Sequence, residues 1–194
     1  MTIKREYRAL DVQADGEEMH VTGYAAVFNE RTLLWESEYS GYRYYEMILP
    51  GAFAHADMSD VVMRYNHGDS ALILARTSNN TLQLAEDSRG LRISATLADT
   101  TAGRDIYALI KRGDISKMSF AFTVDRETAT DDREAKVYLR KIESFGKVFD
   151  VAPVDFPAYD GTSLEARSAD YFKALEQTIQ EAELRKRLRL QTYL

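Results

Sequence analysis

The strongest constraint on the fold is a pair of short alternating segments separated by a turn. In residues 81–85 (TLQLA) leucines alternate with polar residues, and residues 91–97 (LRISATL) show a similar alternation. Between them, residues 87–90 (DSRG) are typical of a tight turn. A period of two places successive side chains on opposite faces of a β-strand. The two segments therefore predict a β-hairpin with one buried face.

Most of the chain before residue 155 carries further strand patterns. β-branched, small and aromatic residues favour strands, which we expect at 18–28, 117–124, 137–145 and 147–154. One helix is predicted over 102–112, where apolar residues recur every three or four positions and Gly113 follows as a stop. The charged run 125–133 is predicted to be a loop. These patterns indicate a mainly β chain with flanking helices, an α+β fold.

The end of the chain has a different composition. From residue 168 onward it contains no glycine or proline. Its apolar residues follow a helical period, and it ends in the basic run 185–189 (RKRLR). We therefore divide the chain into a β-rich domain of residues 1–167 and an amphipathic C-terminal helix of residues 168–194.

Composition removes several classes of partner and chemistry. The chain has no cysteine, which excludes disulfides, thiolate zinc ligands and a cysteine nucleophile. Its net charge of −6 lacks the basic footprint of a nucleic-acid binder. No apolar run approaches the roughly 20 residues of a membrane helix, and the first ten residues lack the hydrophobic region of a secretory signal. We expect neither a nucleic-acid nor a membrane partner.

Three histidines are the candidate proton carriers, because an ordinary imidazole titrates near neutral pH. His67 lies between Asn66 and Gly68, after a strand-like run and before a loop pattern. A catalytic and a structural interpretation are both open for it. His20 lies in a predicted strand and His55 in a loop or helix end, where structural roles are expected. The three have no metal-ligand spacing, so no metal or other cofactor is expected.

Two further polar residues interrupt apolar runs. Ser119 is the polar residue in 118–122 (MSFAF), and a buried hydroxyl requires a partner. It is either a satisfied core serine or a nucleophile for a histidine base. Asp150 stands between Phe149 and Val151, where an acid should be paired, protonated or functional. Glu143 is a second candidate acid.

Short motifs follow in a fixed order between about residues 23 and 168. They include 23–29 (GYAAVFN), 46–53 (EMILPGAF), 66–67 (NH), 75–77 (ART), 87–91 (DSRGL), 112–115 (RGDI), 118–120 (MSF) and 149–154 (FDVAPV). In this order they resemble the prohead (procapsid) maturation proteases of tailed bacteriophages, which are distant relatives of the herpesvirus assemblins. Each motif alone is weak, and their order carries the resemblance.

The resemblance implies a serine endopeptidase with a compact, mostly antiparallel β-barrel of assemblin type. The histidine of the Asn-His motif is the family's base, which gives His67 that role. The serine of the Met-Ser-Phe motif is the nucleophile, which gives Ser119 that role. Asp150 is the expected third member, with Glu143 open as the alternative. Ala121 stands where the family usually has glycine, and a serine is common at the position of Ala152.

The resemblance also implies partners and a location. The expected substrates are the phage scaffolding protein or scaffold domain, other head proteins and the protease itself. The expected partners are the major capsid protein and the portal-containing procapsid, inside the host bacterial cytoplasm; self-association is open. The competing hypothesis is a non-catalytic capsid assembly or scaffold-binding module, in which His67 and Ser119 only pack.

Overall fold

The computed structural model describes residues 9–15, 18–37, 40–68, 72–155 and 177. Within these ranges the chain is mainly β, with one α-helix and two 3-10 turns. The strands are β1 (Ala9–Asp15), β2 (His20–Val27), β3 (Thr32–Glu36), β4 (Arg43–Ile48), β5 (Val62–Met63), β6 (Ala75–Arg76), β7 (Leu82–Glu86), β8 (Gly90–Thr96), β9 (Lys117–Asp132) and β10 (Val137–Val154). The helix is α1 (Thr101–Arg112), and the turns are η1 (Tyr65–His67) and η2 (Thr77–Asn79).

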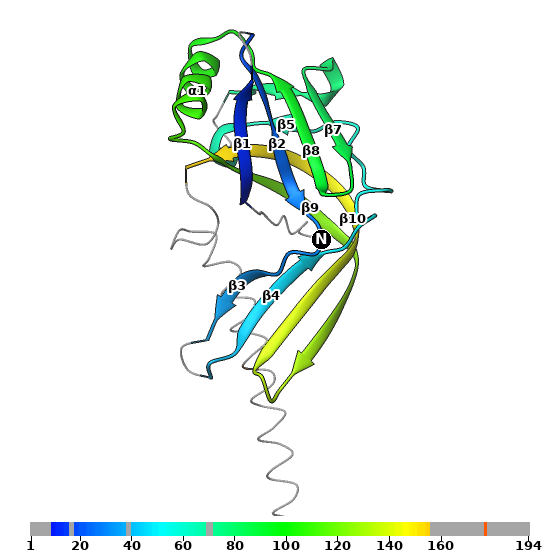
Figure 1. Cartoon of the computed structure of the whole chain (residues 1–194). Helices are drawn as coiled ribbons and strands as arrows, with labels where there is room; N and C mark the ends of the chain where they lie inside the picture. Colours follow the sequence, from blue (N-terminus) through cyan, green and yellow to red (C-terminus); the bar gives the residue numbers. More distant parts are fainter. Residues whose placement is uncertain (1–8, 16–17, 38–39, 69–71, 156–176, 178–194) are drawn as a thin grey trace, which may run out of the picture.

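The two longest strands, β9 and β10, organise the sheet. Its order is β3-β4-β10-β9-β1-β2-β8-β7, with β5 pairing β10 and β6 pairing β5. In Figure 1, β9 and β10 extend through both halves of the molecule. Strands β3 and β4 lie beside their lower part, and β1, β2, β7 and β8 lie in the upper part with α1. β10 therefore connects the two halves of the sheet.

The predicted α+β fold with a dominant sheet is confirmed, whereas the predicted closed barrel is not. The strands at the ends of the order, β3 and β7, do not pair with each other in the described part of the chain. Closing a barrel requires the end strands to pair. In addition, β10 runs antiparallel to β9 but parallel to β4 and β5. Because one edge of β10 is shared by β4 and then β5, the sheet divides there. The assemblin-type barrel remains a prediction.

The local predictions that rest on alternating or helical patterns are confirmed. β7 and β8 form the expected antiparallel hairpin, and β2 covers most of the strand predicted over 18–28. Helix α1 begins one residue before the predicted start. The Thr100 side chain caps it by accepting a hydrogen bond from the Gly103 amide at 3.1 Å. Gly113 ends it with a φ of 86°, a left-handed conformation that glycine adopts without strain.

The loop predicted over 125–133 is wrong, because β9 continues to Asp132. The side chains from residue 125 to 132 are all exposed, so no apolar alternation marks this part of the strand. Backbone pairing with β10 holds it instead, as in the pair of Asp131 with Tyr138. The strands predicted over 137–145 and 147–154 are one strand, β10. The predicted C-terminal helix and the boundary at residue 167 lie outside the described residues.

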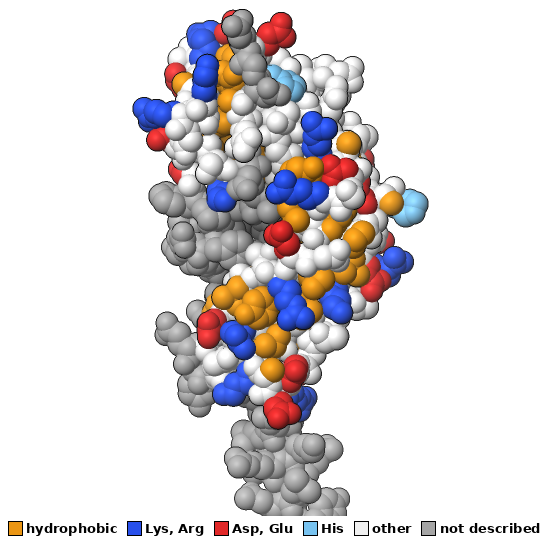
Figure 2. Space-filling model, in the orientation of Figure 1, with side chains coloured by type: hydrophobic (Ala, Val, Ile, Leu, Met, Phe, Trp, Pro, Cys, Tyr) orange, Lys and Arg blue, Asp and Glu red, His pale blue; other side chains and the backbone are white. Residues whose placement is uncertain are grey.

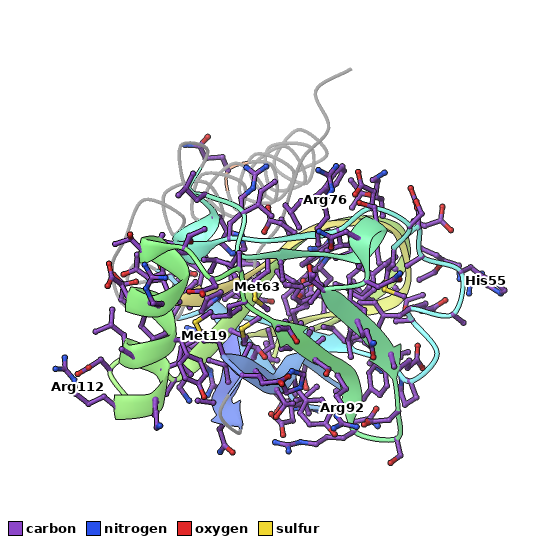
Figure 3. All side chains as sticks on the ribbon, turned by 90° about the horizontal axis from the view of Figure 1, so that it is seen from above. Met19, His55, Met63, Arg76, Arg92 and Arg112 are labelled. Carbon is purple, nitrogen blue, oxygen red and sulfur yellow. The ribbon has the colours of Figure 1, made fainter. Side chains whose placement is uncertain are left out.

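Four phenylalanine rings fix how β9 and β10 face the core. Phe53 stacks on Phe145 with ring centroids 4.4 Å apart, and Phe120 stacks on Phe122 at 4.6 Å. Phe145 meets both β9 rings edge-on. Viewed from above, Met63 of β5 lies in the middle of the molecule (Figure 3) and is fully buried. This packing commits one face of β9 and β10 to the core, and leaves the alternate residues on the other face.

The surface carries both charge signs. Figure 2 shows basic and acidic side chains interspersed on the visible face. Hydrophobic side chains gather over the lower half, where β3 and β4 lie, beside lysine and arginine. In the described residues, no helix is long and apolar enough to cross a membrane.

Candidate active site

Ser119 and Asp150 lie on one face of the β9–β10 ladder, opposite the phenylalanine cluster. Ser119 pairs with Ala152, and Ala121 pairs with Asp150. Directly paired residues project to the same face, and so do alternate residues of one strand. Ser119 and Asp150 are therefore diagonal neighbours, about 7–8 Å apart between their Cα atoms. Both are buried, with 3% and 6% of their surface exposed.

β5 and the η1 turn bring His67 to this face. β5 runs parallel to β10, and the Arg64 amide continues the ladder by donating to the Val151 carbonyl at 3.1 Å. The chain then turns through η1, where Asn66 and His67 have φ values of 51° and 53°. As a result, His67 Nδ1 hydrogen-bonds Asp150 Oδ1 across 83 residues of sequence. Each of these two side chains is only 8% exposed.

The contact with Asp150 fixes how the imidazole can act. A carboxylate oxygen accepts, so the neutral imidazole carries its proton on Nδ1 and donates it to Asp150. The other nitrogen, Nε2, is then the one that can accept a proton. Ser119 supplies a hydroxyl one diagonal step from Asp150 on the same face. A histidine oriented by a carboxylate is the kind of base that activates a serine hydroxyl for acyl transfer.

Glu143, the alternative acid, is engaged elsewhere. Its carboxylate accepts from Arg126 Nε at 2.9 Å and from Thr128 Oγ1 at 3.0 Å. Its side chain is 29% exposed, and the described hydrogen bonds do not join it to His67. The geometry therefore favours Asp150 over Glu143 as the partner of the imidazole.

The other two histidines occupy different surroundings. His20 lies in β2, as expected, where Nε2 is 3.1 Å from Ser94 Oγ and Nδ1 is 3.3 Å from Thr96 Oγ1. Among the described residues, its hydrogen-bond partners include no carboxylate. His55 is exposed on a turn and projects from the edge of the molecule (Figure 3). The described residues also contain no group of three or more histidine and acidic side chains that could hold a metal ion.

The two departures from the family pattern lie directly opposite the candidate catalytic residues. Ala152 faces Ser119 across the ladder, and Ala121 faces Asp150. Both alanines are fully buried. Both candidate catalytic residues on the ladder therefore have a small side chain directly beside them.

Arg64 is a residue that the sequence interpretation missed. Continuing the β5–β10 register by one residue places Arg64 beside Ala152, in one row with Ser119 and two strand spacings, about 10 Å, away. Arg64 is half-buried, and its Nε is buried without a hydrogen-bond partner. No carboxylate of the described residues forms an ion pair with it. In residues 61–64 (VVMR), the buried Val61 and Met63 alternate with Val62 and Arg64. This alternation could have indicated the sheet face on which Arg64 lies.

The tyrosine and asparagine of the turn were also missed. Asn66 Oδ1 accepts a hydrogen bond from the Asp155 amide at 3.2 Å. Burial of the Tyr65 phenol and its hydrogen bond to Asp155 raise the pKa of Tyr65 to about 12. Both residues therefore tie the turn to the segment just after β10. The sequence indicated this turn in one way: Asn66, a residue type that tolerates left-handed backbone, stands directly before the candidate base.

One protein-family model matches most of the chain. The sequence model of the caudovirus prohead serine protease family matches residues 5–177, a range that contains His67, Ser119 and Asp150. This chain belongs to the prohead serine protease family. No curated protein and no solved structure matched the chain. The resemblance inferred from the ordered motifs is thus confirmed, and the prohead protease family gives the chain a serine peptidase role in phage capsid maturation.

Proposed function

We propose that this protein is a serine endopeptidase in which Ser119 is the nucleophile, His67 the general base and Asp150 the acid that orients the base. The observation that carries the proposal is the buried contact of His67 Nδ1 with Asp150, formed on the sheet face that also bears Ser119. Membership of the prohead serine protease family supplies the reaction class.

In the first half-reaction, Ser119 Oγ attacks the carbonyl carbon of the scissile peptide while its proton passes to His67 Nε2. Asp150 stabilises the resulting imidazolium through Nδ1. The tetrahedral intermediate collapses when His67 returns the proton to the leaving amine, which leaves an acyl-enzyme. Water, deprotonated by His67, then attacks the ester, and Ser119 recovers its proton as the acyl product departs.

The negative oxygen of each tetrahedral intermediate requires donors. Backbone amides near Ser119 are the general solution in serine peptidases. Arg64 adds a positive charge on the row of Ser119, where its guanidinium can approach the reacting carbonyl over the small side chain of Ala152. A cation that forms no ion pair with a carboxylate of the described residues fits a site where negative charge develops only during the reaction.

The substrates follow from the family. We propose the scaffolding protein or scaffold domain, other head proteins and the protease itself as substrates. The major capsid protein and the portal-containing procapsid are the assembly partners, and the site of action is the procapsid interior in the host bacterial cytoplasm. In such a compartment the substrate is co-packaged with the enzyme at high local concentration.

Co-expression with the scaffolding and major capsid proteins of the same phage tests this function. Wild-type protein should shorten the scaffolding protein, and Ser119→Ala should leave it intact. Ser94→Ala is the matched control, because Ser94 contacts His20 and lies on β8, away from the proposed site. Normal trimming of scaffold by Ser119→Ala would overturn the proposed nucleophile. Intact scaffold in every sample, with procapsids assembled, would instead favour the assembly-module hypothesis.

A further inference from the structure

The turn that carries His67 passes beyond Asp150 before it returns. β5 pairs with β10 at Asp150 and Val151, and both strands run in the same direction. Three residues after Met63, Asn66 lies beside Asp155, five residues past Asp150 along the chain. His67, the next residue, nevertheless contacts Asp150. The backbone must therefore reverse within one or two residues at this point.

Left-handed backbone provides this reversal. Asn66 has φ 51° and ψ 30°, and His67 has φ 53°. A Cβ atom disfavours such angles, and asparagine is among the residues that tolerate them best. Two consecutive left-handed residues with side chains are uncommon and persist where surrounding contacts hold them. The identity of residue 66 therefore bears on whether His67 can face Asp150.

Side-chain contacts hold the turn against the end of β10. Asn66 Oδ1 accepts from the Asp155 amide at 3.2 Å, and the Gly68 amide donates to the Tyr65 carbonyl at 3.1 Å. The hydrogen bond between Tyr65 and Asp155 contributes to the raised pKa of the phenol. Asn66 thus combines a backbone role with a side-chain contact, while His67 uses its ring for Asp150.

We propose that Asn66 is a positioning residue that holds the His67 imidazole on Asp150 and directed toward Ser119. It touches neither substrate nor reacting atoms, and it acts by setting the direction of the backbone and anchoring the turn at Asp155. This inference rests on the proposed function, because it assigns Asn66 a purpose only if His67 is the base.

Three substitutions separate the two contributions of Asn66. Asn66→Gly keeps the left-handed backbone and removes the acceptor, Asn66→Ala loses both, and Asn66→Asp keeps both. The measurement is the rate at which a fluorophosphonate probe labels Ser119. Misplacing a catalytic group by about 1 Å can cost about 100-fold in rate. We expect a loss of about 10-fold for Asn66→Gly and about 100-fold for Asn66→Ala, with Asn66→Asp within about threefold of wild type.

Asn80→Gly is the matched control. Asn80 is also a left-handed asparagine, with φ 61°, and it directly follows a 3-10 turn. That turn is η2, and the described contacts do not join Asn80 to the His67 turn. Its replacement should leave the labelling rate unchanged. A general effect of losing a left-handed asparagine would appear in both variants.

A proton NMR signature separates positioning from simple stability. An imidazole N–H held on a carboxylate gives a far-downfield proton resonance, which His67→Ala would assign. We expect this resonance in wild type, Asn66→Asp and Asn80→Gly, and its loss or broadening in Asn66→Gly at a temperature where every variant is folded. A merely structural role would lower the melting temperature and leave the resonance unchanged.

The outcomes for the two proposals can be told apart. If wild-type Ser119 is not labelled, the proposed function fails. If wild type is labelled and Asn66→Gly matches it in rate and in the downfield resonance, the role of Asn66 is overturned while the proposed function stands. Glycine fits the backbone of the turn, so this test holds even if Asn66→Ala does not fold.

Discussion

Two histidines of this protein, His20 and His67, have different surroundings. His20 in β2 is half-buried in a regular strand, and its ring nitrogens face Ser94 and Thr96 on β8. His67 follows β5 in a left-handed turn, is 8% exposed and contacts Asp150. Ser119 lies on the same sheet face as Asp150, one diagonal step from it. Each region therefore contains an imidazole and a serine, but in the His67 region β10 lies between β5 and the strand that carries Ser119.

The difference shows which additional features a base requires. The carboxylate at His67 fixes one tautomer and stabilises the protonated ring, whereas hydroxyl partners at His20 can donate or accept and fix neither. Burial makes the interaction with Asp150 stronger than it would be in water. A histidine can thus contact a serine across paired strands without an acid nearby, and the buried acid distinguishes the candidate site. His20 and its neighbours provide matched controls throughout.

The largest expected effect is that of removing each imidazole. His67→Ala should lower the rate of peptide hydrolysis by about 10⁴- to 10⁶-fold, because the base and the nucleophile act as a unit. His20→Ala should leave it unchanged. The rates are measured on a peptide that spans a mapped scaffold cleavage site. Comparable losses in both variants, with both proteins folded, would remove the distinction between the two regions.

Replacing Asp150 and replacing Glu143 should have effects on the hydrolysis rate that differ nearly as much as those of the two histidine variants. Asp150→Asn should lower the hydrolysis rate by about 10³- to 10⁴-fold, because an amide no longer selects the tautomer of His67. Glu143→Gln should have an effect below about twofold, because Glu143 pairs with the exposed Arg126. The same peptide assay measures both rates. The reverse order would make Glu143 the third member.

Filling the space opposite Ser119 should have an intermediate effect. Ala152→Val adds two methyl groups at a fully buried position that pairs with Ser119. We expect a loss of about 10- to 100-fold in rate, because the imidazole is displaced. Ala129→Val, at an exposed position of β9 that pairs with Arg140, is the control. A wild-type rate in a folded Ala152→Val protein would show that this space is not used.

Replacing Arg64 should have the smallest effect on the hydrolysis rate. Unlike the rate, the stability of the protein should increase. Replacing a half-buried cation that lacks a carboxylate partner among the described residues by methionine should raise the free energy of unfolding by about 1 kcal/mol. Urea denaturation measures this change, and Arg92→Met, at an exposed position of β8, is the control. Hydrolysis should fall in Arg64→Met alone. Lower stability with unchanged hydrolysis would assign Arg64 a structural role.

The sequence predicted the elements whose pattern comes from burial. The β7–β8 hairpin, the β2 strand and helix α1 each bury one face, so alternating or helical spacing marks them. The sequence did not predict strand structure where few side chains of the strand are buried. The outer half of β9 has exposed side chains at every position from 125 to 132, and only its pairing with β10 makes it a strand.

The site was predictable only in part. The residue types of His67, Ser119 and Asp150 were visible, and the ordered motifs joined them into one hypothesis. No local pattern could choose Asp150 over Glu143, since both lie on β10. That choice depends on contacts between segments far apart in the sequence, including the β5–β10 pairing that carries the turn of His67. Arg64 and Asn66 were missed for the same reason.

The most direct test of the central claim is to identify the residue that a fluorophosphonate probe modifies. Mass spectrometry of the labelled wild-type protein should find the adduct on Ser119. The adduct should be absent from His67→Ala and present at normal yield in His20→Ala. Modification of another serine, or undiminished labelling of Ser119 without His67, would contradict the claim that a buried imidazole–carboxylate pair activates this hydroxyl.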